Sequence, residues 1–408
     1  MLTLATVAGT SRAQRPESER SPPGEAAPPA PPGAQQPAPP AKAESDSTVD
    51  VQVGAEFASY ADTDHVFVQT PSISGAVASP TQGWRFDAQY LVDVVSAASV
   101  DIVSTASRRW EEVRQAGSLS GEYKPGAFGV SANGQVSSEP DYLSVSAGGA
   151  LTQDLLSKNL TLLLGYEHGH DIAGRSATPF SVFSRPLDRD ALKAGATLLL
   201  GRTTVGSLIA DAVLENGDQS KPYRYVPLFS PGTYVPLGAS IDWVTGARTS
   251  ARPLEQLPLT RQRFAFSGRL AHRFHMATLR LDERLYVDSW ALKATTTDLQ
   301  HLFDLNDRVE TGPHVRLHAQ TPVSFWQRGY LLEPGFDYPA LRTGDRELGP
   351  LVNGTGGWTV RVGLGGDASP TSWTLGFDLN ATWTQYLDDI YITHRLSVVG
   401  GVSLEAQP

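Results

Sequence analysis

The sequence predicts an all-β fold: an antiparallel transmembrane β-barrel of about sixteen strands (range fourteen to eighteen), preceded by a disordered N-terminal segment. Three observations predict it. Apolar and polar residues alternate with period two in one segment after another, and turns of two length classes separate these segments. No run approaches the roughly 18 consecutive apolar residues that a transmembrane helix requires. After residue 50 the 408-residue chain is a single series of such segments, so we expect no second domain there.

The composition excludes several classes of function. The formal net charge is −10 and no Lys/Arg cluster is present, whereas a nucleic-acid partner would require a basic face. The chain has no cysteine, which excludes disulfides, thiol catalysis, cysteine-bound zinc and a lipid-anchored N-terminus. We therefore expect no nucleic-acid partner and no cofactor.

The first fifty residues are expected to serve export and spacing. Residues 1–13 are apolar and end in small residues around Arg12, as in the remnant of a signal peptide, although the usual basic start is absent. The alternative is a hydrophobic N-terminus that has no targeting function. Residues 14–49 are rich in Pro and Ala and have almost nothing to bury, which favours a disordered periplasmic linker over an SH3-type ligand. The barrel is then expected over residues 50–405.

The alternation is clearest near the C-terminus. Between residues 372 and 387 the odd positions are apolar, with Gln385 the exception, and the even positions are polar or small. Trp373 and Trp383 lie ten residues apart on the apolar face. At roughly 3.3 Å per residue and a tilt near 40°, this separation is about 25 Å, the spacing of the two aromatic girdles of an outer-membrane barrel. Trp358 occupies the apolar face of the preceding segment and is a third girdle candidate.

The same pattern recurs along the chain. In residues 277–291, Glu283 falls among outward leucines, which predicts either a bulge or an interface position. The predicted strands at 203–214 and 325–333 have the weakest pattern. Segments with clear alternation are 50–59, 84–94, 126–136, 143–151, 192–200, 262–274, 309–319, 358–367, 372–387 and 390–405.

The connections distinguish a membrane barrel from a soluble β-sandwich. With a periplasmic N-terminus, one side has short turns and the other has long loops rich in Pro, Gly, Asp, Asn and Tyr. This arrangement is typical of the bacterial outer membrane, and a sandwich has no reason to adopt it. Short turns are expected at 79–83, 123–127, 153–159, 201–204, 272–277, 320–328 and 366–371. Long loops are expected at 169–189, 215–259, 292–307 and 334–357.

Two near-identical octads stand in the N-terminal third of the chain. Residues 92–99 (VDVVSAAS) are followed at once by residues 100–107 (VDIVSTAS) and then by RRWEE at 108–112. With DTDH at 62–65 and the KPG turn at 124–126, these motifs make the chain resemble the domain-of-unknown-function 3570 family over most of the predicted barrel. The resemblance implies an outer-membrane barrel and brings no established activity and no functional residues.

Inward positions of neighbouring predicted strands carry a ladder of charge. In a wide barrel such a ladder sets ion selectivity and a transverse field, whereas in a narrow one the same groups pair and fill the interior. Both interpretations stay open, and the locally basic wall favours anionic or small polar solutes if the barrel conducts. Asp93 and Asp101, from the two octads, both fall on inward positions if the strand continues through the repeat. The repeat could instead form a re-entrant hairpin or a plug. The other candidates are Arg263, Arg269, Arg273, Arg280, Asp282, Arg284, Asp288, Arg308, Glu310, His314, Arg316 and His318.

Acidic residues and histidines cluster at predicted extracellular strand ends. Asp62 and Asp64 offer oxygen ligands of the kind that calcium prefers, and His168 and His170 lie at i and i+2, so both face one side of a strand and could share a transition metal. Asp is also frequent at turn tips for backbone reasons, which makes solvated turns the plainer interpretation. A serine of the octads with His168 or His170 as base would make a lipid hydrolase, but no spacing supports it and we expect no enzyme.

The function expected from the sequence is transport, through a passive pore or substrate-selective channel with lumen charges as filter and long loops as outer gate. The alternative is a non-conducting surface scaffold or receptor that binds a partner through loops 215–259 and 334–357. A barrel-wall lipid hydrolase ranks third. Expected partners are outer-membrane lipid, a second copy of the chain in a homo-oligomer, and the barrel-insertion machinery. That machinery often reads a terminal aromatic residue, whereas this chain ends in LEAQP at 404–408.

Overall fold

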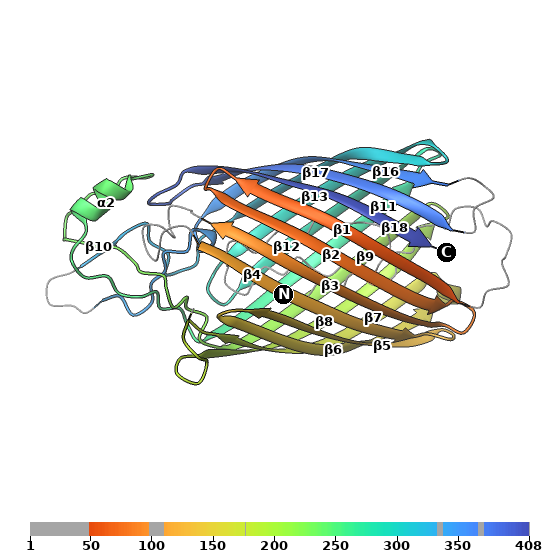
Figure 1. Ribbon diagram of the computed structural model, residues 1–408, viewed down its shortest axis with the longest axis horizontal. Coiled ribbons are helices and arrows are strands. Elements are labelled where there is room, and N and C mark those ends of the chain that lie inside the picture. Colours follow the sequence, from red (N-terminus) through yellow and green to blue (C-terminus); the bar gives the residue numbers. More distant parts are fainter. Residues whose placement is uncertain (1–48, 98–109, 176, 333–337, 366–370, 408) are drawn as a thin grey trace.

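The computed structural model describes residues 49–97, 110–175, 177–332, 338–365 and 371–407. Sixteen antiparallel strands close into one barrel in chain order, with β18 paired to β1 (Figure 1). The predicted fold class and strand number are therefore confirmed. The barrel strands are β1 (Asp50–Asp62), β2 (Val66–Ser79), β3 (Trp84–Ala97), β4 (Trp110–Tyr123), β5 (Phe128–Glu139), β6 (Tyr142–Leu155), β7 (Leu160–Ala173), β8 (Arg185–Gly201), β9 (Thr204–Gly217), β11 (Thr260–Arg273), β12 (Ala277–Asp288), β13 (Lys293–Asn306), β14 (Val309–Gln320), β16 (Leu351–Leu364), β17 (Ser372–Tyr386) and β18 (His394–Gln407).

The remaining elements are short. Two of them, β10 and β15, form a separate two-stranded sheet outside the barrel. No helix in the described part of the chain is long and apolar enough to cross a membrane. The short elements are η1 (Leu156–Lys158), β10 (Leu228–Phe229), α2 (Ile241–Ala247), β15 (Tyr330–Leu331) and η2 (Arg346–Leu348).

Each barrel strand has an apolar and a polar face, because successive side chains of a strand point to opposite sides. On β17, Trp373, Leu379 and Trp383 are exposed, whereas Thr384 and Tyr386 on the other face are buried. An apolar wall of this kind would cost about 25 cal/mol per Å² in water. In a bilayer it is the lipid-facing surface, so the polar face lines the lumen.

Buried apolar side chains gather at one end of the molecule. Among the described residues they form clusters around Val66 and Val68, around Phe229, around Trp290, around Tyr330, and around Tyr386. The inner face of the barrel wall is mostly polar along its middle. The apolar core of this protein therefore lies in its rim and loops.

The two longest connections lie at one end of the barrel, which also has the short turns 63–65, 140–141 and 289–292. The opposite end has the short connections 80–83, 124–127, 156–159, 202–203, 274–276 and 307–308, together with 365–371, which lies partly outside the described residues. The longest connections of the chain are 218–259 and 321–350. Figure 1 shows the long connections, with α2 and β10, projecting beyond one end of the barrel.

Three predicted elements are wrong, and the missed strand and the extra strand cancel in the strand count. Residues 293–306, expected as a long loop, form β13, whose outer face mixes Thr295 and Thr297 with apolar residues and so hid the alternation. The expected short turn at 320–328 and the strand at 325–333 belong to the 321–350 connection instead. The apolar residues of that segment pack inside the loop region rather than against lipid.

The anomaly at Glu283 has a structural explanation. Strand β12 pairs with β13 in continuous register, so the described strand has no bulge at Glu283. The carboxylate lies on the outer face, where the hydroxyls of Thr295 and Thr297 each donate a hydrogen bond of 2.6 Å to it. These bonds satisfy the carboxylate where lipid could not.

Candidate functional site

The inner face of β8, β9, β11 and β12 carries cations and carboxylates at alternate positions, and neighbouring strands pair them. The pairing follows from the register, which places Arg263 between Val213 of β9 and Asp288 of β12. Most of the arginines in this region are therefore neutralised locally. Their ion pairs are Arg261 with Asp288 at 2.5 Å, Arg263 with Glu215 at 3.4 Å, and Arg284 with Asp211 at 3.2 Å.

The ladder continues toward the end with short turns. Arg269 pairs with Asp282 and Arg273 with Asp304, while Arg361 of β16 pairs with Glu310 at 3.2 Å. Arg280 differs from all of these. Within the described part of the chain, no carboxylate lies within the ion-pairing distance of 4.0 Å of its guanidinium. Arg280 is half-buried on the inner face and leaves a local excess of positive charge.

His314 and His318 have different surroundings on the inner face of β14. His314 lies between the carboxylate of Asp298 and the amide of Asn380, each at 3.0 Å, and so connects β13 with β17 across β16. Gly357 of β16 makes this contact feasible, because a Cβ there would lie 2.0 Å from the amide oxygen of Asn380.

The neighbouring candidates on β14 lie closer to the rim. His318 is 8% exposed and is bonded to Thr296 at 2.7 Å, so it packs under the long loops rather than facing the lumen. Arg316 is half-buried on the same face.

Asp93 of β3 is buried in a tight polar contact. Arg114 of β4 donates to its carboxylate at 2.6 Å, and the Thr70 hydroxyl of β2 donates at 2.5 Å. The carboxylate is thus satisfied by its two neighbouring strands. Asp101, its counterpart in the second octad, lies outside the described residues.

The wall formed by β4, β5 and β6 is different in kind. Its inner positions carry short polar side chains rather than a ladder of charge, except near the strand ends. Such side chains leave more room than paired arginines do. The residues of this wall are Ser118, Ser120, Ser131, Asn133, Gln135, Ser137, Ser144 and Ser146.

The three girdle candidates lie on the outer face. Trp358, Trp373 and Trp383 are 51%, 41% and 48% exposed. The Trp358 indole donates to the Thr311 hydroxyl at 2.7 Å, and Trp383 stacks on His394 with ring centroids 4.8 Å apart. The indoles of Trp358 and Trp383 thus combine an apolar face with a polar partner or neighbour, as at a membrane interface.

The described residues of the two longest connections fold into one unit, which we call the cap and define as residues 218–259, 321–332 and 338–350. Strands β10 and β15 pair in parallel, and Gln256 bridges to Arg342. Beneath this pairing, the buried carboxylate of Glu255 accepts a 2.6 Å hydrogen bond from Thr343. Arg224 pairs with Glu255 at 3.6 Å and also with Asp345.

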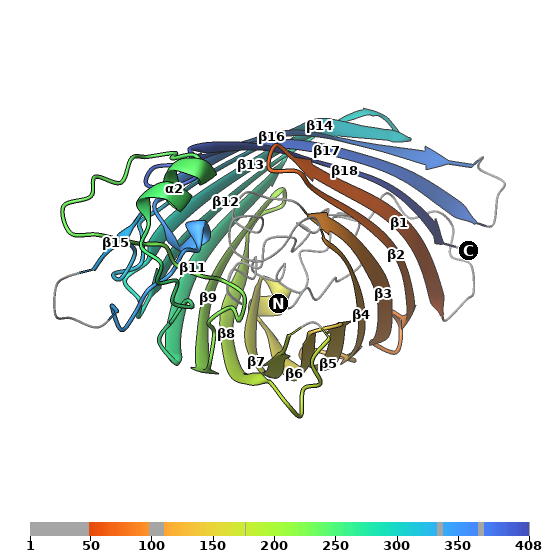
Figure 2. The ribbon, with the colours of Figure 1, turned by 60° about the vertical axis from the view of Figure 1, so that its left-hand side comes forward.

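Side chains attach the cap to distant points of the barrel rim, and Figure 2 shows the cap at one end of the barrel. Arg346 pairs at 3.0 Å with Asp64 in the β1–β2 turn, and both side chains are buried. The Tyr386 hydroxyl of β17 donates to Glu347 at 3.1 Å, and Tyr223 donates to Asp141 in the β5–β6 turn at 2.8 Å. Because the cap emerges between β9 and β11 and between β14 and β16, these contacts carry it to other sectors of the same rim.

Burial shapes the acid–base properties of the cap. Burial raises the pKa of the Tyr330 hydroxyl to about 12. Burial also opposes ionisation of Asp345, but the adjacent Arg224 and Lys221 outweigh it and hold the pKa of Asp345 below its ordinary value. The cap is therefore held by charge pairs that persist at neutral pH.

The metal candidates lie in separate places. The Asp62 carboxylate accepts the backbone N–H groups of Asp64 and Val66 at 2.9 and 3.0 Å, which is the role of a turn-forming aspartate. Asp64 holds the cap through Arg346. His168 and His170 lie on β7, far from that turn in the strand order, so the structure does not bring the four candidates together.

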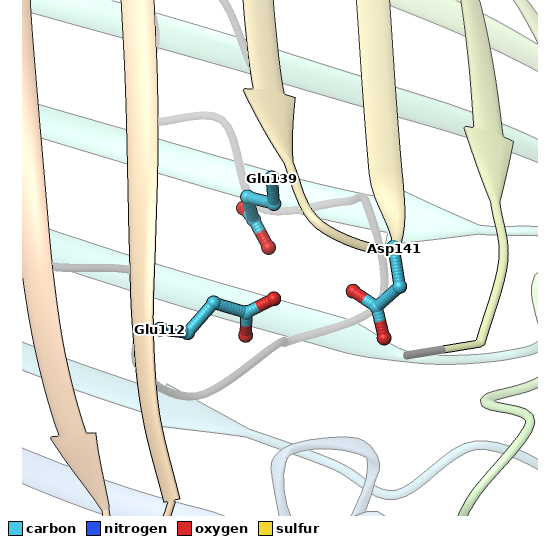
Figure 3. Close-up of side chains that lie close together, drawn as sticks. All are labelled: Glu112, Glu139 and Asp141. Atoms are coloured by element: carbon cyan, nitrogen blue, oxygen red, sulfur yellow. The ribbon is translucent and has the colours of Figure 1, made fainter. Parts of the chain in front are cut away.

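A cluster of three carboxylates escaped the sequence reasoning. Oxygen atoms of Glu112, Glu139 and Asp141 lie within 4.8 Å of one another, from β4, the end of β5 and the β5–β6 turn (Figure 3). Asp141 also accepts the hydrogen bond from Tyr223 of the cap. No motif could have revealed this cluster, because it depends on how β4 and β5 pair.

These features define a transmembrane β-barrel of the outer-membrane type, with a charged wall facing a serine-rich wall and a folded cap over one end. The family model described as "Protein of unknown function (DUF3570)" matches residues 189–376, which confirms the resemblance to the domain-of-unknown-function 3570 family over that part of the chain. The matched residues include most of the charged wall and the cap, whereas the octads and the KPG turn precede them. No curated protein matches the chain.

Several solved structures are loosely similar. CdiB from Acinetobacter baumannii has a TM-score of 0.47 and 11% identity, over 87% of this chain and 60% of that one. Pseudomonas aeruginosa OprD has a TM-score of 0.42 and 7% identity, over 88% and 95% of the two chains. The P. putida toluene transporter TodX has a TM-score of 0.37 and 9% identity, over 89% and 90%. The chain spans less than two thirds of CdiB. At these TM-scores the similarities do not bear on function.

Proposed function

We propose that this protein is a passive outer-membrane channel for small polar or anionic solutes, with the charged wall as filter and the cap as outer gate. The N-terminus is then periplasmic, behind a signal peptide and a proline-rich linker, and the barrel-insertion machinery places the chain in lipid. The observation that carries the proposal is that one side of the lumen is lined by charged side chains and the other by serines and amides. Sixteen-stranded barrels are wide enough to leave an aqueous channel.

The charged wall supports a preference for anions through one residue above all. Paired arginines contribute little net field, because each has a carboxylate beside it. Arg280 has no such partner within the described residues, and Arg361 and Arg269 lie in the same sector of the wall. A solute that passes this sector meets excess positive charge, whereas the middle of the serine-rich wall offers neutral hydrogen-bonding groups.

The cap supports gating at the opposite end. It has an apolar core of its own around Val226, Leu228 and Tyr330, and it contacts the rim through apolar packing on Trp290 and through ion pairs, of which Arg346–Asp64 is buried on both sides. A unit with its own core can move as one body once its contacts with the rim are released. Release of the Arg346–Asp64 pair is therefore the step that we expect to open the mouth.

Single-channel recording in planar bilayers tests this function. The purified full chain should give brief, infrequent open steps, and Arg346→Ala should raise the open fraction several-fold. The control is Arg328→Ala, which removes an exposed cap pair with Asp388 and should change little. If neither the wild type nor Arg346→Ala gives open steps, the protein is not a channel.

A surface scaffold or receptor is the second candidate, and one observation favours it. The cap presents exposed apolar side chains to solvent, with Tyr234 79% exposed and Leu237 43% exposed. A stable folded platform with such residues suits partner binding. An enzymatic role has no comparable support, because the side chains bonded to the β7 histidines are aspartates rather than serines.

A further inference from the structure

The outer face of β7 and β8 carries a cluster of polar side chains that has no role in the proposed transport. His168 and His170 alternate along β7 and point outward with Leu162 and Leu164, as their exposure shows. The register places Asp190 opposite His168 and Asp188 opposite His170. Two histidines and two aspartates therefore share one face of a two-stranded ribbon.

The hydrogen bonds fix how each imidazole is presented. His168 Nδ1 lies 3.0 Å from Asp190 Oδ1, and His170 Nδ1 lies 2.6 Å from Asp188 Oδ1. An ionised carboxylate can only accept, so each Nδ1 carries the proton. In the neutral ring the lone pair then resides on Nε2. Tyr166 donates to Asp190 at 2.6 Å and holds this carboxylate in turn.

Both Nε2 atoms are available. No residue in the described part of the chain makes a hydrogen bond to Nε2 of either ring. The side chains of His168 and His170 are 51% and 47% exposed. A pair of histidines whose Nδ1–H groups are held by carboxylates while Nε2 faces outward is the arrangement found around metal-binding histidines, where the carboxylate sets the ring orientation and raises the basicity of the ligand.

The surroundings are aqueous rather than apolar. On the outer face of β7 the apolar run ends at Leu164, and on β8 it begins at Leu192, so Tyr166 marks the boundary. The histidines lie beyond that boundary, toward the cap end of the strands. An ion from solution can reach them without crossing hydrocarbon.

We propose that His168 and His170 bind a divalent transition metal such as Zn²⁺ through their Nε2 atoms, with Asp190 and Asp188 as the groups that orient them. Two side chains at i and i+2 on one face of a strand can close on a single ion, and imidazole suits zinc, copper and nickel. Water fills the remaining coordination positions. Because the ribbon lies on the outside of the barrel, the bound ion would not obstruct the lumen.

Isothermal titration of Zn²⁺ into the full, untagged chain in detergent tests this site. The wild type should bind one ion with an affinity that His168→Ala and His170→Ala each abolish. Asp188→Asn and Asp190→Asn should keep the site but weaken it by about 10–100-fold, since they act on the orientation of the ligands.

His301→Ala is the matched control, because His301 also faces outward, on β13, beside Phe303 and with no carboxylate bonded to it within the described residues. It should leave Zn²⁺ affinity unchanged. Circular dichroism of each variant verifies that the barrel is folded. Absence of stoichiometric binding by the folded wild type would overturn the proposal, as would binding that survives in the double variant His168→Ala and His170→Ala.

Discussion

The two sides of the lumen differ in how their polar residues are satisfied. From β8 to β14 the inner face is made of arginines and carboxylates that pair across strands, whereas from β4 to β6 it is made of serines and amides. Most arginines of the charged wall are held in place by a carboxylate partner, with Arg280 the exception within the described residues. In the described part of the serine-rich wall the ion pairs, Arg114–Asp93 and Lys124–Asp154, lie toward the strand ends, so the middle of this wall contributes space rather than field.

Both segments of the cap are connected in sequence to strands of the charged wall. Its two segments leave the barrel after β9 and after β14, and its contacts with Asp64 and Asp141 carry it to other sectors of the rim. The end of the molecule that is built from long loops is thus also the end with the buried apolar clusters. Loop length and apolar burial are therefore concentrated at the same end of the barrel.

The largest difference between the walls should appear in stability. Arg261→Ala should lower the free energy of unfolding by about 3–5 kcal/mol, because it leaves the buried carboxylate of Asp288 without its cation. Ser118→Ala on the serine-rich wall should change it by less than about 0.5 kcal/mol. Urea unfolding in detergent, followed by tryptophan fluorescence, gives both values. Equal losses of unfolding free energy in the two variants would contradict the difference between the two walls.

Acid should loosen the cap before it affects the barrel. The pKa of the Asp345 carboxyl is lower in the folded protein than in the unfolded chain. The ionised carboxylate therefore stabilises the cap fully above the ordinary pKa of about 3.9, and this stabilisation is lost as pH falls through the lowered pKa. Asp345→Asn should remove about 1.5–3 kcal/mol from the cap at neutral pH.

Hydrogen exchange measures this prediction. Corrected for the intrinsic rate, exchange in residues 221–225 and 342–348 should accelerate below pH 4 in the wild type and be fast at all pH values in Asp345→Asn. Exchange in β5 serves as the internal reference and should not follow the same curve. A wild-type cap that exchanges identically at pH 3 and pH 7 would show that Asp345 does not hold it.

A smaller effect is expected at the centre of the cap. The Tyr330 hydroxyl donates to the Phe325 carbonyl at 2.8 Å and accepts the Thr343 N–H at 2.9 Å. Tyr330→Phe should therefore cost about 1–2 kcal/mol locally, with the apolar packing retained. Hydrogen exchange at Thr343 reports this cost directly. Protection at Thr343 that is unchanged in Tyr330→Phe would mean that packing alone holds the cap.

The fold was predictable because alternation with period two and segregated loops are local patterns. Sixteen strands were obtained through two compensating errors, at 292–307 and 325–333. Strand β13 was missed because Thr295 and Thr297 interrupt its apolar face to satisfy Glu283, a contact between strands that no single segment reveals. The segment after β14 resembles a strand in composition, but its apolar residues pack in the cap.

The candidate site was predictable only as a set of residues. The alternation along β11 and β12 indicates that Arg263 and Arg280 both point into the lumen. Only the pairing of the strands shows that Arg263 has a carboxylate partner and that Arg280 has none within the described residues. The Glu112, Glu139 and Asp141 cluster and the pairing of His168 with Asp190 also require strand pairing. The cap depends on contacts between segments about ninety residues apart, such as Glu255 with Thr343, for which the sequence has no local signal.

The reversal potential in a salt gradient tests the central claim, that the charged wall sets selectivity. Arg280→Gln and Ser118→Glu each change the lumen charge by one unit in the negative direction, on opposite walls. The account predicts a wild type that prefers anions, a marked shift toward cations in Arg280→Gln, and a smaller shift in Ser118→Glu. Equal shifts in the two variants, or a wild type that does not discriminate, would contradict it.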